Sequence, residues 1–154
     1  MKLYLVQHAK AASEQQDPQR PLTKEGKADL QKIAAFIKPL NLCVDYCWHS
    51  GKKRAEQTAE ILTAVIKVKK AKNARDGLSP NDDVKALRDE LSDTAGDIMI
   101  VGHMPFVSRL ASLLLTGSES TETVAFRQGG IVALSRAEPG KWQVEWMITP
   151  QLVA

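Results

Sequence analysis

The chain begins Met1-Lys2-Leu3-Tyr4-Leu5-Val6-Gln7-His8, which contains one of the two clearest strand patterns in the sequence. The apolar run Leu3–Val6 is followed directly by two polar residues, a pattern typical of a short parallel strand that is covered on both faces. Ile98–Val101 repeats the pattern and is followed by Gly102 and His103. Cys43–Trp48 contains aromatic and β-branched residues and is the third predicted strand.

Segments with helical periodicity lie between and after these strands. We predict helices over four ranges: Lys24–Lys38, Lys52–Ile66, Asn81–Leu91 and Phe106–Leu115. Thr23 is expected to cap the first and Ser50 the second, and Pro105 suits the first helical position of the last.

Two late strands complete the expected elements. Ile131–Leu134 and Trp142–Met147 are separated by a Pro139-Gly140 turn, which favours a hairpin. Lys67–Asp76 is polar, and we interpret it as a loop that flanks a weak strand. The alternation of strands and helices predicts an α/β three-layer sandwich, with a mixed, mostly parallel sheet and helices on both faces. With 154 residues, 1–154 is expected to be one domain.

Composition excludes several classes of protein. The net charge is +3, and no segment gathers basic residues and aromatics into a stripe, so we expect no nucleic-acid partner. The N-terminal apolar run is shorter than the roughly 7 residues of a secretory signal. No apolar run approaches the roughly 18 residues of a membrane span. We therefore expect a cytoplasmic protein without a membrane partner, and its oligomeric state stays open.

The two cysteines, Cys43 and Cys47, lie on one predicted strand. Four residues of strand span about 13 Å, beyond the roughly 7 Å between Cα atoms that a disulfide allows. We expect reduced core thiols, with a metal-binding pair as the weaker alternative.

Polar residues that suit catalysis follow three of the predicted strands. Gln7 and His8 follow the first, His49 and Ser50 the second, and His103 the third, so all three histidines come to the same edge of the sheet. In open α/β sheets, ligands bind at this edge. Arg54 lies one turn into the next helix, whose N-terminus also favours anions.

Three interpretations of this edge compete. Each histidine could simply end a strand, or the three could form a metal site, although Arg54 would repel a cation there. The third interpretation is phosphoryl transfer, in which a neutral imidazole attacks phosphorus and an arginine binds its oxygens. It accounts for the whole set of residues. We expect His49 itself to be structural or peripheral.

The sequence resembles the histidine phosphatase superfamily, which is phosphoglycerate mutase-like, and specifically its small bacterial phosphohistidine phosphatase branch. Four motifs carry the resemblance, in order and at fitting separations: Leu3–Ala11, Arg20-Pro21-Leu22-Thr23 with Gly26, Ser50–Ala59, and Val101–Pro105. Gly129-Gly130-Ile131 and Trp146 with Pro150 are lesser matches.

The resemblance implies a role for each matching residue. His8 matches the histidine that is transiently phosphorylated, Arg54 an arginine that binds phosphoryl oxygens, and His103 the second catalytic histidine. Ser50 falls where the family often contacts phosphate, and Arg20 lies in a motif that reaches the substrate. No metal or organic cofactor is implied.

One position departs from the family. Gln7 stands where the family has arginine before the nucleophilic histidine. Glutamine keeps two N–H donors but loses the charge and the fixed fork. The expected function is therefore a phosphatase that works through a phosphohistidine intermediate on phosphorylated protein or a small phospho-substrate. The alternative is a phospho-ligand-binding protein that Gln7 has left with weak or no turnover.

No general acid is evident between the two histidine motifs. Asp82 and Asp83 are the nearest carboxylates, and we expect them in the first turn of a solvent-facing helix. A missing acid suits a substrate with an easily displaced leaving group, such as protein phosphohistidine, and disfavours unactivated sugar phosphates.

Overall fold

A computed structural model describes residues 1–154. Its strands are β1 (Lys2–Gln7), β2 (Cys43–His49), β3 (Lys67–Ala74), β4 (Ile98–Gly102), β5 (Ile131–Glu138) and β6 (Lys141–Ile148). Its α-helices are α1 (Lys24–Ile37), α2 (Lys53–Thr63), α3 (Val84–Ser92) and α4 (Phe106–Thr116), and two short 3₁₀ helices cover Lys38–Leu40 and Pro150–Leu152.

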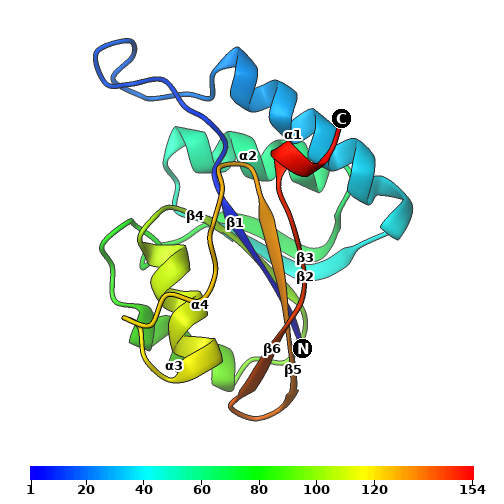
Figure 1. Cartoon of the computed structure of the whole chain (residues 1–154), viewed down its shortest axis with the longest axis vertical. Coiled ribbons are helices and arrows are strands. Elements are labelled where there is room, and N and C mark those ends of the chain that lie inside the picture. The colour runs from blue at the N-terminus through cyan, green and yellow to red at the C-terminus, as the bar shows by residue number, and fades with distance from the viewer.

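The six strands form one sheet in the order β3-β2-β4-β1-β5-β6. The first four of these are mutually parallel, whereas β5 runs antiparallel to β1 and β6 antiparallel to β5. Helices α1 and α2 cover one face and α3 and α4 the other (Figure 1). The predicted three-layer sandwich and its mixed, mostly parallel sheet are confirmed.

Successive side chains of β1 point to opposite faces of the sheet and so enter two separate hydrophobic cores. Leu3 and Leu5 of β1 pack with the apolar faces of α3 and α4, while Tyr4 and Val6 pack with α1 and α2. Both clusters are fully enclosed, because β1 has a neighbouring strand on each side and a helical layer on each face. The two polar residues that follow β1 are therefore fixed at the end of a rigid element.

The expectation of a loop at Lys67–Asp76 is wrong, because β3 occupies most of this range and pairs with β2. The sequence of β3 lacks the apolar pattern of a strand. An edge strand has one partner and little buried surface, so lysines stand where apolar residues are usual. Lysines on an edge also discourage a further strand from adding to the sheet.

Three helix starts differ from expectation. Lys52, not Ser50, is the residue that precedes α2, and no side chain caps that helix. Pro105 precedes α4 instead of occupying its first turn. Asp83 caps α3 by accepting the backbone N–H of Lys85, and the Asp82 carboxylate accepts the backbone N–H of Ser79 at 2.8 Å, so both lie before that helix. The cap at Thr23, which accepts the backbone N–H of Gly26, is confirmed.

Cys43 and Cys47 are free thiols, as predicted, and burial raises the pKa of Cys47 to about 12. None of the helices has the length and apolar character that crossing a membrane requires.

Candidate active site

The carboxyl ends of β1, β2 and β4 meet at one edge of the sheet. Gln7 is in register with Gly102, and His49 with Val101, so the residues that follow these strands are neighbours. The backbone N–H of His8 donates to the carbonyl of Gly102 at 3.0 Å, which ties the end of β1 to that of β4. The structure thus brings His8 and His103 together, as the sequence predicted.

His8 is buried, and its ring orientation is fixed by a backbone group. Its Nδ1 lies 2.7 Å from the carbonyl oxygen of Ala9. A carbonyl can only accept, so Nδ1 carries the proton and Nε2 of the neutral ring keeps a lone pair. Burial lowers the pKa of His8 to about 4 against the opposing Ala9 hydrogen bond, and the positive charges of Arg54 and Arg20 lower it further. His8 is therefore a neutral imidazole at physiological pH.

His103 lies beside His8, with ring centroids 5.0 Å apart and planes inclined by 54°. Its Nε2 is 2.6 Å from the Ser50 hydroxyl, while its buried Nδ1 has no hydrogen-bond partner. Burial lowers the pKa of His103 to about 3, helped by His8, Arg54 and Lys52. The His103 ring thus has one nitrogen in contact with Ser50 and one buried nitrogen without a partner in the protein.

Among the Arg and Lys side chains, Arg54 has the largest effect on the pKa values of both His8 and His103. It lies in the first turn of α2, and its buried Nε has no hydrogen-bond partner. Burial, followed by the charge of Arg20, lowers its pKa, whereas Glu14 acts in the opposite direction. A half-buried guanidinium without a hydrogen-bonded carboxylate, at a helix N-terminus, is suited to bind an anion.

Thr58 connects the segments that carry His8 and Arg54. Its fully buried hydroxyl accepts the backbone N–H of Ala9 at 3.1 Å and donates to the carbonyl of Arg54 at 2.8 Å. The residue after His8 is therefore held against the first turns of α2 by one side chain. Thr58 is a positioning residue, because it acts through these backbone groups.

We expect Thr58→Val to lower the free energy of unfolding by about 1–3 kcal/mol and to lower kcat, because the buried N–H of Ala9 loses its acceptor. Thr63→Val is the matched control, since the Thr63 hydroxyl donates to a carbonyl of α2 in the same way but touches no other segment near the site. Denaturant unfolding and phosphatase kinetics measure both effects. Equal losses in the two variants would contradict the positioning role.

Arg20 lies on the segment between β1 and α1, in a left-handed backbone conformation with φ of 48°. Its Nε donates to the carbonyl of Ala12 at 3.0 Å. The backbone N–H of Leu22 donates to the Gln57 side chain at 2.7 Å, which ties this segment to α2. Gly26 permits the close approach of α1, since a Cβ there would overlap the carbonyl oxygen of Lys10.

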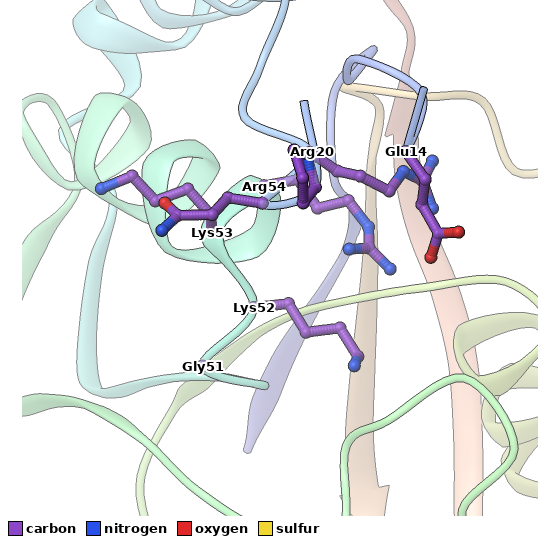
Figure 2. A pocket seen from close by; sticks show the side chains of 8 residues that line it. Glu14, Arg20, Gly51, Lys52, Lys53 and Arg54 are labelled. Carbon is purple, nitrogen blue, oxygen red and sulfur yellow. The ribbon is translucent and has the colours of Figure 1, made fainter. Parts of the chain in front are cut away.

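A cavity of about 470 Å³ opens between this segment and the start of α2 (Figure 2). No hydrophobic side chain lines it, and its walls are Glu14, Pro18, Gln19, Arg20, Gly51, Lys52, Lys53 and Arg54. Arg20 and Arg54, both predicted from the sequence, therefore share one opening. Lys52 and Lys53 were not among the predicted site residues, although they lie between Ser50 and Arg54 in the motif.

The remaining predicted residues are placed differently. The hydroxyl of Ser50 forms a hydrogen bond with Nε2 of His103. Gln7 ends β1, and its carbonyl accepts the backbone N–H of Gly129. Lys10 forms an exposed ion pair with Glu25 at 2.6 Å. His49 is buried, and its Nδ1 accepts the backbone N–H of Gly51 at 3.2 Å.

The three histidines do not form a metal cluster. No group of three or more His, Cys, Asp or Glu side chains is arranged to hold a metal ion. The structure instead brings together the rings of His8 and His103, with the charge of Arg54 acting on both.

The fold, with a neutral His8 beside His103, is compatible with the phosphoryl-transfer interpretation of this edge. Residues 3–78 match the histidine phosphatase superfamily (branch 1), the family that the sequence motifs resemble. The chain is similar to the phosphohistidine phosphatase SixA of Escherichia coli (strain K12), with 23% identity over 155 residues that cover 97% of this chain and 94% of that protein.

Two further comparisons agree. A structure of the protein histidine phosphatase SixA complexed with tungstate superposes with a TM-score of 0.85, at 23% identity and 99% coverage of both chains. A protein of unassigned function from Picosynechococcus is 29% identical over 141 residues, covering 87% of this chain and 84% of its own length. The sandwich is thus the phosphoglycerate mutase-like fold of histidine phosphatases.

Proposed function

We propose that the protein is a phosphatase that transfers a phosphoryl group to His8 and then to water. The observation that carries the proposal is the His8 ring, with Nδ1 held by the Ala9 carbonyl and Nε2 left as a neutral nucleophile beside His103. The similarity to SixA proteins supports a phosphohistidine substrate.

In the first step, Nε2 of His8 attacks phosphorus and the bond from phosphorus to the leaving nitrogen breaks. A protonated phosphohistidine leaves as a neutral imidazole, so no carboxylic acid is needed to protonate it. Water then attacks phospho-His8, releasing phosphate and regenerating the neutral ring. Arg54, with the N-terminus of α2, stabilises the charge on the transferred oxygens. The scheme uses no metal ion and no organic cofactor.

His103 donates a hydrogen bond to the transferred group, and Ser50 fixes the tautomer that makes this possible. The Ser50 Oγ accepts the backbone N–H of Lys52 at 3.3 Å and lies 2.6 Å from Nε2 of His103, and the proposal assigns the hydroxyl as donor to this nitrogen. The ring proton then lies on Nδ1, the nitrogen without a partner. Ser50 thus acts through His103 instead of binding substrate directly.

The second candidate is a phospho-ligand-binding protein with little turnover. The observation that favours it is Gln7, which carries no charge at the residue before His8. It predicts phosphate binding without hydrolysis, and it makes turnover the measurement that separates the two functions.

The proposal is tested by incubating the protein with a radiolabelled phosphohistidine protein, quenching in alkali, and mapping the label. We expect label at His8, absent from His8→Ala, together with released phosphate. His49→Ala is the control, because it removes a histidine at the same edge that the proposal leaves out of the reaction. Phosphate release without label on His8, or label retained in His8→Ala, would refute the mechanism.

Activity is expected to persist into acid. His8 loses its lone pair only when the pH falls through its lowered pKa of about 4, so the acidic limb of kcat/KM should lie well below the ordinary value of 6.5. Stability has the same sign: the unfolded chain binds protons first, so stability is complete above pH 6.5 and declines as the pH falls toward 4. Initial rates, corrected for spontaneous hydrolysis, measure the limb; a midpoint near 6.5 would contradict a buried neutral His8.

A further inference from the structure

The cavity at the start of α2 gathers several positive charges, three of which act on His103. Four of its lining side chains are cationic and one, Glu14, is acidic. None of the six ion pairs in the structure includes Arg20, Lys52 or Arg54. Like charges that converge without carboxylate partners repel one another, and an anion in the cavity relieves that repulsion.

The cations form two groups: Arg54 is the inner one, and Arg20 and Lys52 are the outer ones. Arg54 has a buried Nε without a hydrogen-bond partner, and in the proposed reaction it binds the transferred phosphoryl group. Arg20 is half-buried and is fixed by the carbonyl of Ala12, whereas Lys52 is exposed. In Figure 2 Lys52 extends into the open space that Arg20 and Arg54 border. Both outer charges act on His103, so they lie within electrostatic reach of the reacting centre.

We propose that Lys52 and Arg20 form a second anion-binding position, which takes a negatively charged group of the substrate next to its phosphoryl group. The inference rests on the proposed function for the identity of the first group. The absence of hydrophobic lining disfavours an aromatic or aliphatic neighbour and favours a carboxylate or a second phosphate. The substrate class is thus an acidic phosphoprotein surface or a compound with two phosphoryl groups.

Lys53 supplies the matched control. It is adjacent to Lys52 and carries the same charge, but it pairs with Glu56 at 3.7 Å and points away from Lys52 in Figure 2. Its charge is also not among those that lower the pKa of His103. Removing either lysine changes the net charge equally, so a difference between the two variants reports position and not overall charge.

Binding is measured first, by calorimetry at low salt, with inorganic phosphate and with methylenediphosphonate, which carries a second anionic group and is not hydrolysed. Because exposed ion pairs are each worth a few-fold in affinity, we expect the diphosphonate to bind roughly tenfold more tightly than phosphate. Lys52→Gln should remove most of this advantage and Lys53→Gln should keep it. Equal affinity for the two ligands, or equal loss in the two variants, overturns the second position.

Turnover then identifies the source of the second charge. Two phosphohistidine peptides are compared, one with glutamates beside the phosphohistidine and one with glutamines. A higher kcat/KM for the glutamate peptide that Lys52→Gln abolishes supports a protein surface as the substrate. No preference between peptides, with the diphosphonate advantage intact, supports a doubly phosphorylated small molecule. If neither peptide is hydrolysed and His8 takes no label, the proposed function fails, while the binding comparison still decides the second position.

Discussion

Replacing Arg54 with glutamine is expected to lower kcat by about 10²–10³-fold, the loss seen when one preorganised donor to a developing charge is removed. Arg54 lies at the N-terminus of α2, and its buried Nε has no hydrogen-bond partner in the protein. No carboxylate forms an ion pair with it, although Glu14 lines the same cavity, and in the proposed reaction its charge acts on the phosphoryl oxygens. Glutamine retains a donor at this place but neither the charge nor the fork.

The control is Lys53→Gln, which removes one positive charge from the preceding residue, and we expect it to leave kcat within about threefold because that lysine is exposed and paired with Glu56. Arg54→Lys separates charge from geometry, and we expect it to recover only part of the loss. Steady-state kinetics and a thermal melt are needed together, since a fall in Tm would indicate disruption of α2. A kcat for Arg54→Gln close to that of the unsubstituted protein would remove Arg54 from the reaction.

Much of this architecture could be predicted because its central strands are buried on both faces. Leu3–Val6 and Ile98–Val101 are continuous apolar runs for that reason, and the polar residues after them mark the edge where ligands bind. His8 and His103 could therefore be placed together before their side-chain contacts were known. The same logic failed for β3, whose lysine-rich edge has no apolar signature.

Side-chain contacts inside the site were less predictable. Ser50 was expected to cap α2 or to touch substrate, but its hydroxyl contacts His103, a partner 53 positions away in sequence. Thr58 resembled an ordinary member of an amphipathic helix, and its contact with the N–H of Ala9 depends on how α2 crosses the end of β1. Such contacts depend on tertiary packing, and the periodicity of helices and strands does not predict them.

Gln7→Arg is expected to raise kcat/KM by up to about 10²–10³-fold, the inverse of deleting a preorganised donor. Gln7 lies at the end of β1 in register with Gly102, immediately before His8 and beside the residue that precedes His103. An arginine there would add a planar cation next to the nucleophile, where the superfamily motif has one. Lys10 instead forms an exposed ion pair with Glu25.

The size of the gain separates the two functions left open by the sequence. A large gain over a measurable starting rate identifies an attenuated phosphatase, whereas an active starting protein with little gain means that Arg54, Arg20 and Lys52 already supply sufficient charge. Gln7→Met is the control, since it keeps a similar length without amide donors, and we expect it to lower kcat if the amide contacts phosphate. Phosphate bound by the unsubstituted protein without turnover, followed by turnover in Gln7→Arg, would identify the natural chain as a binding protein whose reaction was lost at this one residue.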